Sequence, residues 1–149
     1  MAIKGKDLPD IAFKLWSTIC LKLFLVLIIS VFIFFKAAYY INEIWLFVTI
    51  FLIFILFSII VIYKEFKKLS LKNEYFKHIL PSYGFIGLNA LLIYMSLTWR
   101  ALFLLIPLIS IVVFFSQGSI IGRIIVIILE FLVGYPSIYW YLKSKTKLG

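Results

Sequence analysis

Residues 44–63 read IWLFVTIFLIFILFSIIVIY, a run of 20 residues that contains no charged side chain. At about 1.5 Å per residue, a helix of this length crosses the roughly 30 Å hydrocarbon core of a bilayer. A second apolar run, residues 15–35, comes before it and is interrupted only by Lys22. The short link between the two runs carries Tyr39 and Tyr40, which are typical of a membrane interface. These two runs predict a transmembrane helical hairpin.

The composition of the whole chain agrees with this prediction. Of its 149 residues, 65% are hydrophobic and 14% are charged, against about 45–50% and about 25% in ordinary soluble domains. A soluble protein of this size has too little interior to bury so many apolar side chains. We therefore expect an all-α integral membrane protein, a polytopic helical bundle that forms one membrane domain over residues 1–149.

A hydrophilic segment, residues 64–78, follows the hairpin. Its cations outnumber its two carboxylates, and they are Lys64, Lys67, Lys68, Lys72 and Lys77. We expect this segment to be cytoplasmic, since lysine and arginine near the ends of spans prefer that side. Its apolar residues are spaced loosely like one face of a helix, which is compatible with a helix along the membrane surface.

Three further apolar runs follow, at residues 79–98, 101–121 and 124–142. Only Trp99 and Arg100 separate the first two, whereas the sequence Ser-Gln-Gly-Ser at 116–119 predicts a turn before the last. The run at 79–98 contains proline, two glycines and an asparagine, so it is the least suited to lipid. It is interpreted as interfacial, re-entrant or an extra span.

The positions of the cations favour four spans over five. With five spans and a cytoplasmic amino terminus, nine Lys and Arg residues lie inside and five outside. If residues 79–98 do not cross, twelve lie inside and only Lys36 and Arg123 lie outside. The second distribution fits the preference of cations for the cytoplasmic side better, so we expect four spans with both termini cytoplasmic. Five spans stay open.

Glu130 is the most unusual single residue, because it lies near the middle of the last run. A charged carboxylate there costs at least about 2.5–3.5 kcal/mol on insertion scales. Either Glu130 serves as a proton or cation relay or as half of an intramembrane ion pair, or it is protonated and bonded to a neighbouring helix. The candidate polar partners are Arg123, seven residues earlier on the same face, and Lys22 on the first span. Lys22 could equally extend its ammonium group to the interface.

Gly118 and Gly122 form a GxxxG pattern, which permits close approach of two helices in lipid. The pattern overlaps the predicted turn, so Gly118 could instead be a turn residue. Both interpretations are kept.

No catalytic, cofactor or metal site is predicted. His78 is the only histidine, which excludes or nearly excludes haem ligation by two histidines, a histidine-rich metal site and a Ser-His-Asp triad. Cys20 is the only cysteine, which excludes an intramolecular disulfide. The net charge of +9 comes from clusters between apolar runs. It therefore indicates contact with anionic lipid head groups rather than with nucleic acid. We do not expect an enzyme.

The size, the basic charge, the aromatic-rich apolar runs with short links, and the basic segment at 64–78 together resemble small inner-membrane self-protection proteins of mobile elements. The resemblance is to the exclusion proteins of F-type conjugative plasmids, which keep a second copy of the element from entering the cell. It implies a non-enzymatic protein of the bacterial inner membrane that recognises a membrane-protein partner, and it transfers no functional residue. A bacteriocin immunity protein, a small transporter or channel subunit using Glu130, and an accessory subunit of a membrane complex are the alternatives. A homo-oligomer is compatible with each.

Overall fold

The computed structural model describes residues 7–37, 43–72, 74–116 and 119–146. They form four long helices, which are α1 (Leu8–Ala37), α2 (Glu43–Lys72), α3 (Ile86–Ser116) and α4 (Ile120–Lys145). A short 3-10 helix, η2 (Glu74–Phe76), follows α2. All four long helices are long and apolar enough to cross a membrane. The predicted all-α fold class with four spans is confirmed.

One property of lipid explains why these residues form long helices. Hydrocarbon offers no hydrogen-bond partner, so each spanning segment must satisfy its own backbone groups. The helices α3 and α4 also continue through Pro107 and Pro136, which membrane helices tolerate because neighbouring groups can satisfy the carbonyl that a proline leaves free. The start of α4 is capped by Ser119, whose Oγ accepts a hydrogen bond from the backbone N–H of Gly122 at 3.2 Å. The turn predicted at 116–119 falls between the end of α3 at Ser116 and the start of α4 at Ile120, and residues 117 and 118 of it lie outside the described residues.

The third helix differs from the sequence-based expectation. We expected residues 79–98 and 101–121 to be separate runs, but α3 continues without a break across Arg100. The guanidinium of Arg100 donates to the carbonyl of Ser96 at 3.0 Å and to Oγ of Ser144 on α4 at 3.3 Å. Neutral acceptors of α3 and α4 thus bind the guanidinium inside the fold, although Nε is buried without a hydrogen-bond partner among the described residues, and the helix continues through Arg100.

The basic segment after the hairpin, residues 64–78, also differs in part from the sequence-based expectation. Residues 64–72 are not a separate helix but the last turns of α2. The 30 residues of α2 extend about 45 Å, which exceeds the roughly 30 Å of hydrocarbon. The lysine-bearing end of α2 therefore has the length to continue beyond the apolar layer.

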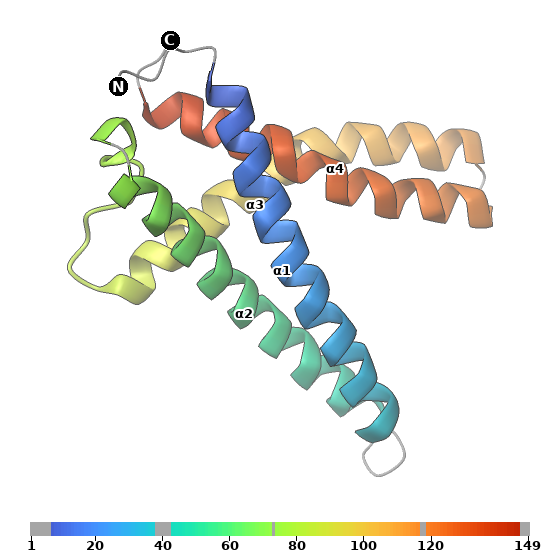
Figure 1. Ribbon diagram of the computed structural model, residues 1–149. Coiled ribbons are helices and arrows are strands. Elements are labelled where there is room, and N and C mark those ends of the chain that lie inside the picture. Colours follow the sequence, from blue (N-terminus) through green and yellow to red (C-terminus); the bar gives the residue numbers. More distant parts are fainter. Residues whose placement is uncertain (1–6, 38–42, 73, 117–118, 147–149) are drawn as a thin grey trace.

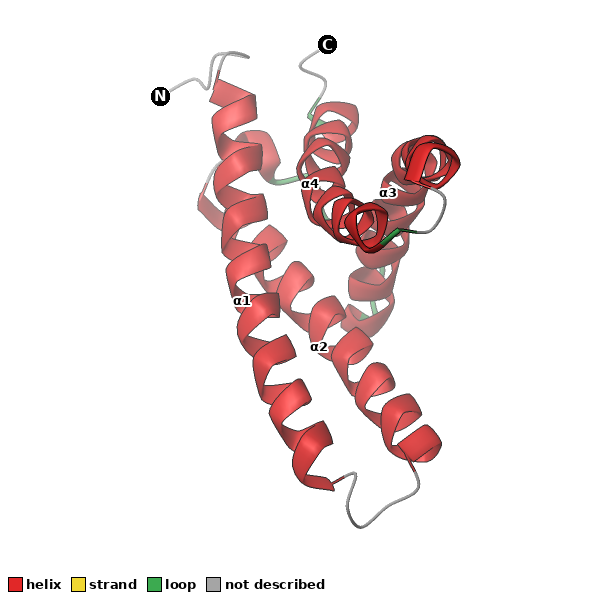
Figure 2. Cartoon of the chain, turned by 90° about the vertical axis from the view of Figure 1, so that its right-hand side faces the viewer, coloured by secondary structure: helices red, strands yellow, loops and turns green. Residues whose placement is uncertain are grey.

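The four helices form two hairpins that meet at one end and diverge at the other. Figure 1 shows the start of α1, the end of α2, the start of α3 and the end of α4 gathered together, while the hairpin α1–α2 and the hairpin α3–α4 extend in different directions. Figure 2, turned by 90°, shows the same divergence. In the bundle, α1 packs on α2 and α4, and α3 packs on α4 and α2.

The buried core lies at the end where the helices meet. It combines one half of each helix with the segment that joins α2 to α3, and its fully buried members include Ala12, Phe66, Phe76, Ile79, Ile93, Tyr141 and Leu142. The diverging ends instead expose large apolar side chains, such as Phe32 and Ile106. In lipid this exposure carries little penalty, since acyl chains are as apolar as the side chains.

Tyr141 is the centre of this core. Its hydroxyl donates to the carbonyl of Ile79 at 2.7 Å, which fixes the α2–α3 connection to α4. Its ring meets Phe66 of α2 edge to face, with ring centroids 5.4 Å apart. The guanidinium carbon of Arg100 lies 5.3 Å from the Tyr141 ring centroid, within the range of a cation–π contact. One side chain therefore joins α2, α3, α4 and the connecting segment.

Candidate functional site

A cavity of about 400 Å³ lies where the two hairpins begin to diverge. All four helices line it, from Trp16 and Cys20 on α1 and Phe54 on α2 to Ala101 on α3 and Glu130 on α4. Most of the remaining lining is aliphatic or aromatic. The cavity is therefore an apolar recess with one carboxylate, at the level of the membrane spans.

The helical repeat of α4 places Glu130 in this cavity. Glu130, Gly134, Ser137 and Ile138 follow the spacing of one helix face. Ser137 and Ile138 are buried, whereas Glu130, about two turns nearer the diverging end, is exposed. The carboxylate thus continues the packed face of α4 at the point where the neighbouring helices separate.

A glycine holds α1 and α4 together beside the cavity. A Cβ on Gly134 would lie 2.8 Å from Nε1 and 2.9 Å from Cδ1 of Trp16, closer than real Cβ contacts. The absence of a side chain allows the Trp16 indole N–H to donate to the carbonyl of Phe131 at 3.1 Å. This contact forms one wall of the recess.

Gly134→Ala is expected to destabilise the fold by about 1–2 kcal/mol, because the added methyl displaces the Trp16 indole and breaks its hydrogen bond. The unfolding free energy in detergent micelles would measure the loss. Gly84→Ala is the matched control, because no atom lies within 4 Å of a Cβ built at Gly84. Equal stability of the two variants would contradict the assigned role of Gly134.

Two hydroxyl groups share the cavity with Glu130. Oγ1 of Thr98 donates to the carbonyl of Tyr94 at 2.9 Å, and Oγ of Ser137 donates to the carbonyl of Val133 at 2.8 Å. Both hydroxyl hydrogens are thus used within their own helices, while the oxygen lone pairs remain able to accept. Glu130 makes no hydrogen bond or ion pair with any residue that the structure describes. The oxygen atoms of the cavity are therefore acceptors, and the thiol of Cys20 adds a weak donor.

The three ionisable residues singled out from the sequence do not come together. Arg123 is exposed on α4 and lies outside the cavity lining. Seven helical residues separate it from Glu130, which is about 10 Å along the axis and too far for an ion pair. Lys22 points to α2, where its ammonium donates to a carboxyl oxygen of Glu65.

The glycine pair is only partly described. Gly118 lies outside the described residues. Gly122 is buried in the first turn of α4, where its N–H meets the capping Ser119. Because α4 begins at Ile120, only one member of the pair lies in that helix.

Glu65 is the polar residue that sequence reasoning placed differently. It belongs to the hydrophilic segment that we expected to be cytoplasmic, yet Glu65 is only 7% exposed. It binds Lys22 across the α1–α2 interface and Lys68 at 3.2 Å on its own helix. Its position was readable from the pattern, because Ile62, Glu65 and Phe66 have the spacing of one buried helix face.

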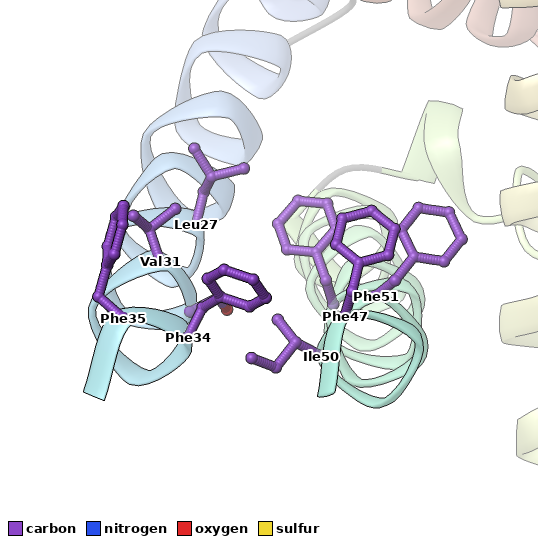
Figure 3. A pocket seen from close by; sticks show the side chains of 9 residues that line it. Leu27, Val31, Phe34, Phe35, Phe47, Ile50 and Phe51 are labelled. Carbon is purple, nitrogen blue, oxygen red and sulfur yellow. The ribbon is translucent and has the colours of Figure 1, made fainter. Parts of the chain in front are cut away.

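A second cavity, of about 550 Å³, lies between α1 and α2, in the halves of these helices that are distant from the core. Figure 3 shows Phe34 of α1 and Ile50 of α2 directed toward each other across it, with Phe47 and Phe51 beside them. Its one polar side chain, Ser30, donates to the carbonyl of Val26 at 2.8 Å. This cavity offers contact to apolar chains and no reactive group.

Among the described residues no three His, Cys, Asp or Glu side chains form a group that could hold a metal ion. The chain matches no protein family, no curated protein and no solved structure. The cavity with Glu130 is therefore the candidate site because of its geometry alone, without support from a relative.

Proposed function

We propose that this chain is a non-enzymatic multi-pass membrane protein that binds a specific protein partner within the membrane. The observation that supports this is the cavity between the hairpins, where Glu130 has no partner among the described residues. A carboxylate at this depth is costly and usually marks a functional contact. The surrounding apolar walls suit a membrane-embedded partner better than a water-soluble substrate.

The more specific proposal is protection of the host cell, as the resemblance to conjugative exclusion proteins implies. The membrane is then the bacterial inner membrane, and the end where the helices meet is cytoplasmic. Exposed cations gather at that end, and they are Lys14, Lys64, Lys67, Lys68, Lys72, Lys143 and Lys145 on the helices and Lys77 in the segment that joins α2 to α3. This end would contact anionic lipid head groups of the inner leaflet.

Expression of the chain in recipient cells is expected to lower the transfer frequency of an F-type conjugative plasmid at least tenfold. Ala101→Phe, which fills the cavity, should abolish the effect at equal protein level. Leu102→Phe adds a similar ring at the neighbouring position, which does not line the cavity, and should keep the effect. Survival against pore-forming bacteriocins, measured with the same strains, tests the immunity alternative. Absence of protection in both assays overturns the self-protection role.

A second candidate is a transporter or channel subunit, because Glu130 lies in a cavity that all four helices line. This function requires flux. The recognition proposal expects no proton or cation flux when the chain alone is reconstituted into vesicles. If the reconstituted chain conducts protons or cations and Glu130→Gln abolishes this flux, transport replaces recognition as the function.

A further inference from the structure

The charge of Glu130 is not balanced by the cations that the described spans carry nearby. Lys22 is bound to Glu65. Arg100 is held by Ser96 and Ser144 and by the rings of Trp140 and Tyr141. Arg123 is about 10 Å away along α4. An ionised Glu130 therefore needs a cation from outside this fold.

The cavity has the chemistry of a cation site. Its lining holds the carboxylate of Glu130 and the hydroxyl oxygens of Thr98 and Ser137, whose hydrogens are already donated to their own helices. An ammonium or guanidinium group brings several N–H donors and no acceptor, so it complements this set. A neutral hydroxyl or amide would match it less well, because it brings fewer donors.

The form of the recess favours a helix as the carrier of that cation. The cavity opens between two hairpins that diverge (Figures 1 and 2), and its walls include apolar side chains such as Leu23, Leu27 and Phe131. The apolar stem of a lysine or arginine can lie against such walls while its charged head reaches the carboxylate. Ionisable residues inside membranes commonly pair with one another in this way.

We propose that the cavity receives a transmembrane helix of the partner that carries one Lys or Arg at the depth of Glu130. This inference rests on the proposed function and specifies the chemistry of the partner. Glu130 binds the cation, and the diverging hairpins hold the helix from two sides.

The test uses the full chain, purified and reconstituted into vesicles of zwitterionic phosphatidylcholine, which removes attraction by anionic lipid. Two synthetic single-span Leu-Ala peptides serve as probes, and they differ only in a central Lys or a central Leu. Energy transfer from a donor dye on a carboxyl-terminal tag to an acceptor on the peptide reports binding. The Lys peptide is expected to bind at least tenfold more tightly than the Leu peptide.

Glu130→Gln should lower the affinity for the Lys peptide to that for the Leu peptide. Glu74→Gln is the matched control, because Glu74 is an exposed carboxylate in η2 outside the cavity, and it should keep the preference. Equal binding of the two peptides by the natural chain overturns the inference, and so does a preference that survives Glu130→Gln.

Ala101→Phe separates this inference from the proposed function, because it fills the cavity and leaves Glu130 in place. It should abolish binding of both peptides. If it does so while the natural chain prefers neither peptide, the cationic partner is excluded and membrane recognition at the cavity stands. If binding of both peptides survives Ala101→Phe, the cavity is not the docking site, and both proposals fail.

Discussion

Tyr141→Ala is expected to destabilise the four-helix assembly by about 3–5 kcal/mol, the range for removal of a large buried aromatic side chain. Tyr141 is 1% exposed, so the substitution leaves a cavity where α2, α3 and α4 meet. It also removes the hydrogen bond to Ile79 and the ring that faces Arg100. The free energy of unfolding, measured by titrating denaturing detergent into mild micelles, would show the loss.

Tyr141→Phe isolates the hydrogen bond from the packing. It keeps the ring against Phe66 but leaves the buried carbonyl of Ile79 without its donor, which should cost about 1–3 kcal/mol. Tyr83 supplies the control, because its side chain is exposed and its replacement by Phe should change stability by less than about 0.5 kcal/mol. A Tyr141→Ala variant as stable as the natural chain would show that the helices are not held together at this end.

Glu65→Leu is expected to cost about 2–3 kcal/mol, because it leaves the ammonium of Lys22 without its counter-ion on an apolar helix. Loss of one partner of a fully buried pair costs about 3–5 kcal/mol. Here the side chain of Lys22 is 41% exposed, and its partial solvation reduces the loss. The same detergent titration would measure it.

The double variant Lys22→Met with Glu65→Leu should return to within about 1 kcal/mol of the natural stability, because both charges are then replaced by apolar groups. Glu74→Leu is the control for removal of an exposed carboxylate. If the double variant is as unstable as Glu65→Leu alone, the two residues are not energetically coupled, and the α1–α2 interface depends on other contacts.

The local sequence pattern was sufficient to predict the helices, but it did not show which helices pack against each other. The uncharged run at 44–63 lies inside α2, because twenty apolar residues in lipid have no better conformation than a helix. Arg100 shows the limit of the same pattern. A charge beside a tryptophan suggested a boundary, yet it lies inside α3, since Ser144, 44 positions later in the chain, supplies a hydrogen bond.

Only one residue of the candidate site could be predicted from the sequence. Glu130 stood out because a carboxylate in the middle of an apolar run is costly wherever the helix packs. Its surroundings were not readable, because the helical repeat shows which residues share a face of α4 but not which helix that face meets. Lys22 illustrates this, since its ammonium group pairs with Glu65 across the α1–α2 hairpin and does not reach α4.

By itself the sequence predicted a helical membrane protein, because the length and apolarity of each segment decide whether it can enter lipid, and the positions of its cations favoured four spans over five. Only the tertiary structure decided that the helices meet at one end around Tyr141, that Glu65 binds Lys22, and that Glu130 faces a cavity. The reason is that apolar surface alone does not drive one helix against another in lipid. Association there depends on close packing and on polar contacts between residues far apart in the chain.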